Sequence, residues 1–296
     1  MNEAAGAPVS GDFLAQMAHG SRERVRLAQA RLGSGALRAL ARQREQPPAL
    51  RFALRSFNII AELKLRSPAA GRLGAADEPL EARLLAYASA GAAAVSVLTE
   101  PTRFDGALEH LELAARALQP RGIPVMRKDF LVDPYQVLEA RAAGAGGVLV
   151  ILRMLAESQV AELIECALEL GLFVLLEAFD ELDLQRAHSH VARYLRQSAA
   201  GGAAAPPALL VGLNCRDLGT LEVVPGRLEQ LAVHLPSGVP RVAESGVARQ
   251  EDCARLAAAG YDGALIGGAL MASADPRGAL QGLLAAGRRA RGGGGP

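Results

Sequence analysis

Two lysines stand out in this sequence for the chemistry they could perform. The chain of 296 residues carries 32 lysines and arginines, but lysine occurs only at Lys64 and Lys128. Lysine differs from arginine because it can lose its proton at an accessible pH and carries its charge on a compact ammonium group. A codon bias toward arginine would explain why lysine is rare. It would not explain why each lysine follows a short apolar run, so we interpret both as candidate catalytic residues.

The two apolar runs belong to a repeated pattern in which a short aliphatic run, a loop and an alanine- and leucine-rich helical segment alternate. The pattern predicts eight strands: Asn58–Leu63, Ala94–Leu98, Pro124–Arg127, Gly147–Leu152, Phe173–Glu177, Leu209–Leu213, Arg241–Glu244 and Ala264–Ile266. Continuous apolar strands that alternate with helices are typical of a buried parallel sheet. Eight units favour a closed barrel over an open doubly wound sheet. We therefore predict an α/β fold, a single (β/α)8 TIM barrel with an N-terminal helical extension.

The chain divides into four predicted segments. Residues 1–11 are small and polar, and we expect them to be poorly ordered. Residues 12–57 form the helical extension, with a helix from Asp12 to about Leu40 that is interrupted at Gly20-Ser21. The barrel occupies 58–285, and the low-complexity stretch 286–296 is predicted to be a disordered tail. Within the barrel, the alanine- and glycine-rich insertion 197–207 is interpreted as a flexible spacer at the bottom face.

The overall composition excludes several classes of partner. The net charge is +1, which gives no general electrostatic reason to bind nucleic acid or an anionic membrane. No apolar run approaches the length of a membrane span, and the N-terminus lacks a signal-peptide pattern. The 3 cysteines are odd in number and have no CxxC spacing, which fits a reducing compartment. We expect a cytoplasmic protein that binds neither nucleic acid nor membrane, and the five histidines lie away from the strand ends, so we propose no metal site.

Polar residues lie at or just beyond the C-terminal ends of the predicted strands, where barrels of this type build their active sites. These residues are Glu62, Lys64 and Ser67 at the end of the first strand, Lys128 at the end of the third, Glu177 at the end of the fifth, Asn214 and Arg216 at the end of the sixth, Glu244, Ser245 and Gly246 at the end of the seventh, and Gly267 and Gly268 after the eighth. Buried charges are costly unless they are matched. So many ionisable groups beside apolar runs therefore indicate a shared site.

The neighbours of each strand end indicate its chemistry. A lysine among carboxylates stays an ammonium that can donate a proton, whereas one among cations or apolar walls becomes a nucleophile. Since three glutamates accompany it, we favour a general-acid Lys128 over a Schiff-base lysine. The pairs Ser245-Gly246 and Gly267-Gly268 follow the last two strands, where barrels commonly bind phosphate through backbone N–H groups. A phosphorylated small-molecule substrate is the natural inference.

The same residues give a family resemblance. The stretches that carry it are Ile60-Ala61-Glu62-Leu63-Lys64 with Ser67-Pro68, Ser96-Val97-Leu98-Thr99, Arg127-Lys128-Asp129-Phe130, Asn214 with Arg216-Asp217-Leu218, and Glu244-Ser245-Gly246. Together they resemble indole-3-glycerol phosphate synthase, from about residue 10 to 285. The resemblance implies a cofactor-free step of tryptophan biosynthesis. In it, 1-(2-carboxyphenylamino)-1-deoxyribulose 5-phosphate closes its ring, loses carbon dioxide and loses water to give indole-3-glycerol phosphate.

The resemblance also implies a role for each site residue. Lys128 would be the general acid at the ketone, Glu177 the general base of the later steps, and Lys64 a second acid or the group that holds the substrate carboxylate. The residues that would complete the catalytic site are Glu62, Asn214, Glu244 and Ser245. Those that would hold the phosphate are Ser67, Arg216, Gly246, Gly267 and Gly268, and those that would hold the anthranilate ring are Phe104, Phe130 and Leu152.

Other interpretations of the same strand ends remain open. One is another phosphate-binding barrel enzyme, such as phosphoribosylanthranilate isomerase or a Schiff-base aldolase. The other is a catalytically silent barrel that serves as a partner subunit. The lysines and glutamates at the strand ends, Glu62, Lys64, Lys128, Glu177 and Glu244, count against a silent barrel. We expect no cofactor and a monomer or weak homo-oligomer.

Overall fold

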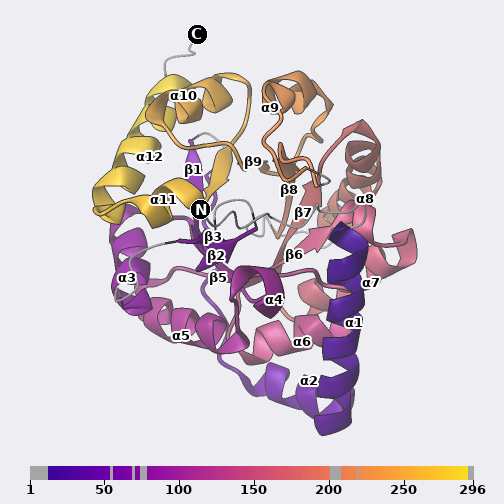
Figure 1. The fold of residues 1–296 in the computed structure, drawn as a ribbon. Coiled ribbons are helices and arrows are strands. Elements are labelled where there is room, and N and C mark those ends of the chain that lie inside the picture. Colours follow the sequence, from indigo (N-terminus) through magenta and orange to yellow (C-terminus); the bar gives the residue numbers. More distant parts are fainter. Residues whose placement is uncertain are drawn as a thin grey trace, which may run out of the picture.

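The core of the fold is a closed barrel of eight parallel strands in the order β1-β10-β9-β8-β7-β6-β5-β4. The computed structural model describes residues 13–53, 56–68, 71–73, 79–200, 208–218 and 220–292. The barrel strands are β1 (Asn58–Leu63), β4 (Ala94–Leu98), β5 (Val125–Lys128), β6 (Gly147–Ile151), β7 (Phe173–Ala178), β8 (Leu209–Asn214), β9 (Arg241–Glu244) and β10 (Gly263–Ile266). The predicted (β/α)8 barrel is confirmed, with helices arranged around the strands in Figure 1.

Helices follow most strands and cover the outside of the barrel. Their bounds are α3 (Leu80–Ala90), α4 (Pro101–Phe104), α5 (Leu108–Leu118), α6 (Pro134–Ala142), α7 (Glu157–Glu169), α8 (Glu181–Ala200), α9 (Arg227–Leu231), α10 (Gln250–Ala258), α11 (Gly268–Ala272) and α12 (Pro276–Gly292). The described residues also form the 3-10 turns η1 (Gln119–Arg121), η2 (Leu152–Met154) and η3 (Ala232–His234). After β1, β2 (Arg66–Ser67) pairs antiparallel with β3 (Gly71–Arg72). Gly91 ends α3 in the left-handed conformation, at φ 93°, which glycine adopts without strain.

Two apolar layers hold the barrel together. The larger lies between the outer faces of the strands and the helices, and includes Tyr87, Leu111 and Leu256. The second fills the barrel interior with residues such as Ile60, Met126 and Leu210. The strands are buried on both faces, which explains why they appear in the sequence as continuous apolar runs.

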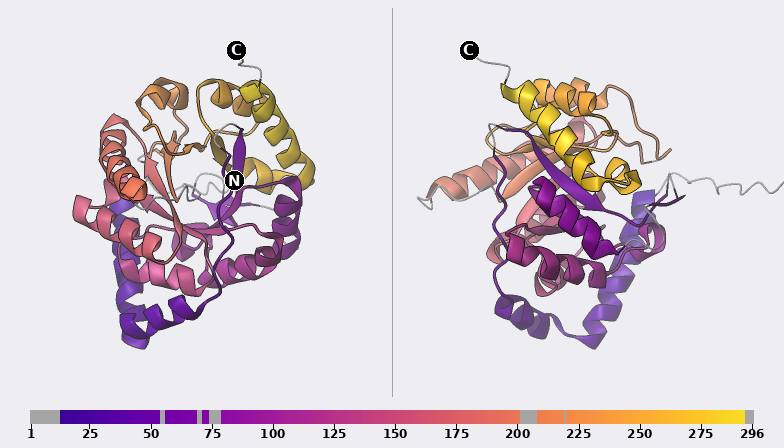
Figure 2. Two further views of the ribbon diagram at one scale, coloured as in Figure 1. Left: turned by 180° about the vertical axis from the view of Figure 1, so that it is seen from behind. Right: turned by 90° about the vertical axis from the view of Figure 1, so that its left-hand side faces the viewer.

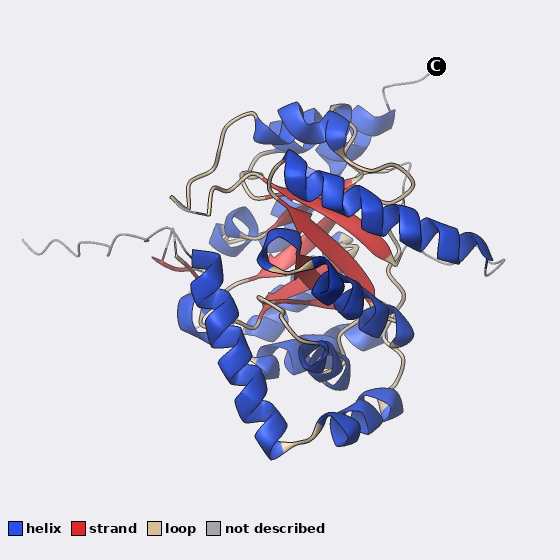
Figure 3. Cartoon of the chain, turned by 90° about the vertical axis from the view of Figure 1, so that its right-hand side faces the viewer, coloured by secondary structure: helices blue, strands red, loops and turns tan. Residues whose placement is uncertain are grey.

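The N-terminal extension consists of two helices, α1 (Phe13–Arg31) and α2 (Ser34–Gln43). Figure 3 shows them at the periphery of the molecule, outside the barrel strands. The predicted break at Gly20-Ser21 is wrong, because both residues continue α1. Ser21 is fully buried, and its hydroxyl donates a 2.5 Å hydrogen bond to the carbonyl of Phe130, so this turn of α1 packs on the barrel. The break comes at Gly33, which is extended and precedes α2.

The ends of the predicted segments differ from the structure in two places. Helix α12 continues to Gly292 and buries Ala286 and Gly287, so the predicted disordered tail is wrong for residues 286–292. Helix α8 runs through the start of the predicted spacer to Ala200. The remainder of the spacer, 201–207, lies outside the described residues, as do 1–12 and 293–296. Figure 2 shows α8 projecting from the side of the barrel and α12 lying across it.

Candidate active site

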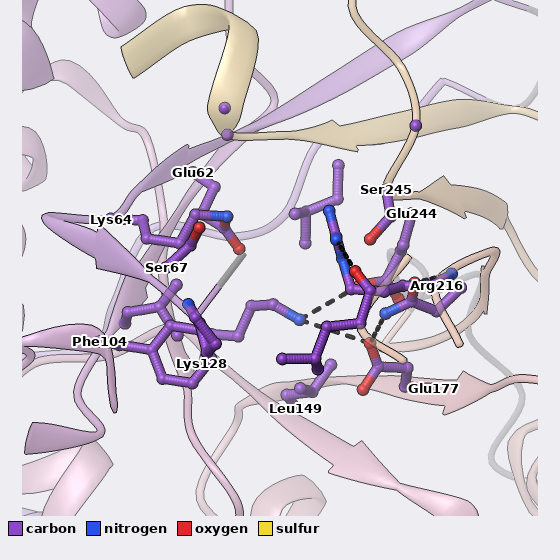
Figure 4. A pocket seen from close by; sticks show the side chains of 18 of the residues that line it. Glu62, Lys64, Ser67, Phe104, Lys128, Leu149, Glu177, Arg216, Glu244 and Ser245 are labelled. Carbon is purple, nitrogen blue, oxygen red and sulfur yellow. Dashed lines mark hydrogen bonds and ion pairs between the residues drawn. The ribbon is translucent and has the colours of Figure 1, made fainter. Parts of the chain in front are cut away.

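A cavity of about 370 Å³ opens at the C-terminal ends of the strands. It is lined by the predicted residues Glu62, Lys64, Ser67, Phe104, Lys128, Phe130, Glu177, Asn214, Arg216, Glu244, Ser245, Gly246, Gly267 and Gly268. Figure 4 shows many of these side chains pointing toward one another from different strands. Residues separated by up to about two hundred positions in the chain thus share one cavity, as the strand-end argument predicts.

Glu62 and Lys64 form an ion pair at the end of β1. Lys64 Nζ donates a 2.6 Å hydrogen bond to Glu62 Oε1, and Glu62 is buried whereas Lys64 is partly exposed. Burial favours the neutral form of Glu62, but Lys64 and Lys128 outweigh it and hold the pKa of this carboxyl below its ordinary value. Glu62 is therefore a buried carboxylate that keeps its charge.

Lys128 is the last residue of β5 and extends into the centre of the cavity. Its Nζ lies 3.5 Å from Oε1 of Glu177 and 3.4 Å from Oε2 of Glu244. Burial disfavours the ammonium, but Glu177, Glu244 and Glu62 more than compensate and raise the pKa of Lys128 above its ordinary value. A lysine in these surroundings remains protonated and can donate a proton, which is the requirement for a general acid.

Glu244 is the last residue of β9, and its surroundings favour the neutral, protonated form of its carboxyl group. Burial and the nearby charge of Glu177 raise the pKa of Glu244 to about 8, although Lys128 opposes the shift. Among the described residues, Oε1 of Glu244 is a buried oxygen without a hydrogen-bond partner, while Oε2 faces Lys128. The two oxygens therefore differ in their surroundings.

Asn214 orients the second carboxylate beside Lys128. Its Nδ2 donates a 2.7 Å hydrogen bond to Oε1 of Glu177, the oxygen that also faces Lys128. Its Oδ1 accepts a 2.9 Å hydrogen bond from the backbone N–H of Arg216. Asn214 is thus fixed at both ends of its amide, and it fixes Glu177 in turn.

The loops after β9 and β10 give the cavity a glycine-rich rim. Ser245 and Gly246 both adopt a φ of 66°, a conformation that is uncommon for serine. At Gly246, a Cβ would lie 3.0 Å from both Cys215 and Val223. Gly267 comes directly before α11, and Gly268 begins that helix with open space where its Cβ would be.

Aromatic side chains form the apolar wall of the cavity. The rings of Phe104 and Phe130 lie 6.1 Å apart, and Phe13 from α1 meets Phe130 edge-on at 5.8 Å. The prediction that Leu152 joins this wall is wrong, because Leu152 is buried among the residues between the strands and the helices. The wall uses Leu149 instead.

Helix α1 is held against the cavity by polar contacts. Arg24 lies 2.7 Å from Asp129 and 3.3 Å from Glu100, both of which are buried. Burial raises the pKa of Asp129, but Arg127 and Arg24 outweigh it and hold that pKa below its ordinary value. The helix thus brings Phe13 to the cavity through a charged contact next to Lys128.

Sequence reasoning missed several contributors to the site besides Leu149. Phe13 and Leu14 line the cavity, and their only signal is their place at the apolar start of the predicted helix. Gly212 lies in β8 below Glu244, and a glycine within a strand signals a close approach of another group without naming it.

Within the described residues, no cluster of three or more histidine, cysteine, aspartate or glutamate side chains has the arrangement of a metal site. None of the helices in the described part of the chain is both long and apolar enough to traverse a membrane.

Comparison with known families identifies what the sequence is similar to. The family model described as "Indole-3-glycerol phosphate synthase" matches residues 14–283. A protein of that name from Mycobacteroides abscessus is 38% identical over 280 residues, which cover 94% of this chain and 96% of the relative. Another of that name, from Parafrankia sp., is 43% identical over 230 residues, 78% of each protein.

Comparison with solved structures supports the fold alone, because the sequence identities are low. Thiamine phosphate pyrophosphorylase from Pyrococcus furiosus superposes with a TM-score of 0.54 at 14% identity, covering 80% of this chain and 99% of that one. 3-Hexulose-6-phosphate synthase from Salmonella typhimurium gives a TM-score of 0.55 at 14% identity, over 79% of this chain and 100% of that one.

Proposed function

The chain belongs to the indole-3-glycerol phosphate synthase family, and from that membership we propose how its own residues divide the work of the reaction. The protein is a carboxy-lyase of tryptophan biosynthesis that acts on 1-(2-carboxyphenylamino)-1-deoxyribulose 5-phosphate. The substrate must bond a ring carbon to its ketone carbon, lose carbon dioxide and then lose a hydroxyl as water. Each step moves a proton or a negative charge, so acids, bases and an anion site are needed.

Lys128 donates a proton to the ketone oxygen as the new carbon–carbon bond forms. The observation that carries this role is the position of its Nζ, 3.5 Å from Glu177 and 3.4 Å from Glu244. The nearby carboxyl groups favour the charged ammonium of Lys128. A Schiff base requires a neutral amine, so these surroundings count against Schiff-base chemistry.

Glu177 serves as the general base of the later steps, with Asn214 fixing the orientation of its carboxylate. Lys64 acts as a second acid or holds the carboxylate that leaves as carbon dioxide. Glu62 contacts Lys64 at 2.6 Å and keeps its ammonium in place. Glu244 and Ser245 complete the catalytic site at the end of β9.

Different residues of the cavity hold the phosphate and the aromatic ring of the substrate. The phosphate is held by Ser67, Arg216, Gly246, Gly267 and Gly268, whose cation, hydroxyl and backbone N–H groups suit an anion. The ring packs against Phe104 and Phe130, with Phe13 closing the wall.

The proposal extends to the surroundings of the protein. We expect a cytoplasmic enzyme, monomeric or weakly self-associating, that binds no nucleic acid, membrane or cofactor. Its net charge of +1 supports the expectation that it binds no nucleic acid.

The test uses the absence of tryptophan from the sequence. Purified protein given the substrate should produce indole fluorescence with little protein background, and Lys128→Ala should reduce its rate by at least about a hundredfold. Full activity of folded Lys128→Ala would refute the acid assignment. A covalent adduct trapped on Lys128 by borohydride would instead support Schiff-base chemistry.

A further inference from the structure

Gly212 lies in the middle of β8, where the backbone conformation does not require a glycine. It pairs with Glu177 of β7 and Val242 of β9 in the parallel ladder, and it is not among the glycines with positive φ. Glycine within a strand costs roughly 0.5–1 kcal/mol relative to alanine. The reason for this glycine must therefore lie in what its missing side chain leaves free.

The space above Gly212 is filled by the carboxyl group of Glu244. A Cβ on Gly212 would overlap Oε1 of Glu244 and lie 3.1 Å from its Cδ. The same Cβ would lie 3.2 Å from Cδ1 of Leu175, so Leu175 borders the niche. The niche offers Oε1 no hydrogen-bond donor among the described residues, which agrees with its unpartnered state.

We propose that Gly212 is a positioning residue for the reaction, because its missing side chain forms the niche that holds Oε1 of Glu244 and turns Oε2 toward Lys128. The contact that results is the 3.4 Å approach of Oε2 to Nζ of Lys128. The inference rests on the proposed role of Lys128 as general acid. It adds that β8 sets the direction of a carboxyl group carried by β9.

A methyl group in the niche would force Glu244 toward the mouth of the cavity. Lys128 would then lose one of its two close carboxylates and keep Glu177. Glu244 would leave its buried position, so its pKa would fall. Gly212 itself does not line the cavity, so the substitution would act on the bound substrate only through Glu244.

The first measurement is the pH dependence of kcat and KM for Gly212→Ala. We expect kcat to fall about tenfold or more, as for a misplaced group near the chemistry, with a smaller change in KM. Any inflection of kcat that belongs to Glu244 should move to lower pH. Unchanged kcat and an unchanged pH profile would overturn the proposal.

The second measurement is a double-mutant cycle with Glu244→Ala, read in both Tm and kcat. In the wild-type background, Gly212→Ala should lower Tm by several degrees, because the new methyl group overlaps a carboxyl group. In Glu244→Ala only the contact with Leu175 remains, so the same substitution should lower Tm and the residual kcat much less. An equal loss in both backgrounds would show a merely structural glycine and overturn the proposal. The Tm arm does not depend on activity. If Gly212→Ala alone fails to fold, the double variant should fold, and failure of both variants would overturn the proposal.

Gly147→Ala is the matched control. Gly147 begins β6, and a Cβ there would overlap the ring of Phe173, so the crowding is similar but no carboxyl group is involved. We expect a lower Tm with the wild-type pH profile of kcat. A shift of that profile in Gly147→Ala equal to that in Gly212→Ala would mean that general loosening of the barrel causes it, and would overturn the proposal. Loss of activity in Lys128→Ala tests the proposed function separately.

Discussion

At the scale of single residues, Glu177 connects the proposed acid to the rest of the site. It faces Lys128 at 3.5 Å and accepts a 2.7 Å hydrogen bond from Asn214. Glu177→Gln keeps the shape of the side chain but cannot take up a proton, so we expect intact folding and a turnover lower by about a hundredfold or more. Circular dichroism and the fluorescence assay would measure both. Glu162→Gln, at an exposed position on α7, is the control, and near-normal turnover of Glu177→Gln would contradict the base assignment.

Glu244 gives a prediction about stability and pH. Its pKa is raised from 4.5 to about 8 in the folded protein, mainly by burial. Between these values the unfolded chain loses the proton while the folded protein keeps it, so this group lowers stability as pH rises. Glu244→Gln has no such proton to lose. Its Tm relative to wild type should therefore be higher at pH 8.5 than at pH 5, by roughly 3 °C or more.

Differential scanning calorimetry at the two pH values would check this prediction. Glu251→Gln, an exposed position on α10, should show no such dependence. A Tm difference for Glu244→Gln that is the same at both pH values would mean that Glu244 titrates normally in the folded protein.

Residue types at strand ends could be recognised from the sequence, but not their contacts. Lys128 and Glu244 were predicted because each lies at the end of a short apolar run. The choice of Leu152 failed because the strand ends at Ile151, and the chain then turns through η2 toward the helices. Gly212 could not be recognised, since its partner is a carboxyl group from a neighbouring strand.

At the scale of elements, the strands were predictable and the helix break was not. Three strands, Asn58–Leu63, Ala94–Leu98 and Arg241–Glu244, begin and end where the apolar runs do. Gly20-Ser21 has the composition of a helix start, but Ser21 is buried against Phe130, and this tertiary contact lets α1 continue.

Helix α1 gives the prediction at this scale, because Arg24 fastens it to Asp129 and Glu100. Arg24→Met removes both contacts but keeps much of the side-chain volume. We expect KM to rise about tenfold, since Phe13 would no longer be held in the wall, with a smaller change in kcat. Steady-state kinetics would separate the two effects. Arg22→Met, exposed on the same helix, should behave as wild type, and an unchanged KM for Arg24→Met would show that α1 does not need this contact.

At the scale of the whole molecule, the barrel closes where its first strand meets its last. β1 pairs with β10 on one side and β4 on the other, and α12 contacts α10, α3 and β1 beside this junction. A sequence pattern predicts separate strands, whereas closure depends on pairing between residues about two hundred positions apart. The tail was mispredicted for the same reason. Its low-complexity sequence gives no sign of the contact that α12 makes with the start of the barrel.

That contact can be tested at Gly287, which packs on the ring of Phe57 just before β1. A Cβ on Gly287 would overlap the ring at Cδ1 and lie 2.9 Å from Cε1. Gly287→Leu should lower stability by about 1–3 kcal/mol, the usual cost of overpacking, and leave KM unchanged because the site is at the opposite ends of the strands. Urea unfolding and steady-state kinetics would measure the two. Gly292→Ala, which has open space around it, is the control. If Gly287→Leu were as stable as wild type, the end of α12 would not be needed to close the barrel, and the fold would end near residue 285, where the sequence pattern places it.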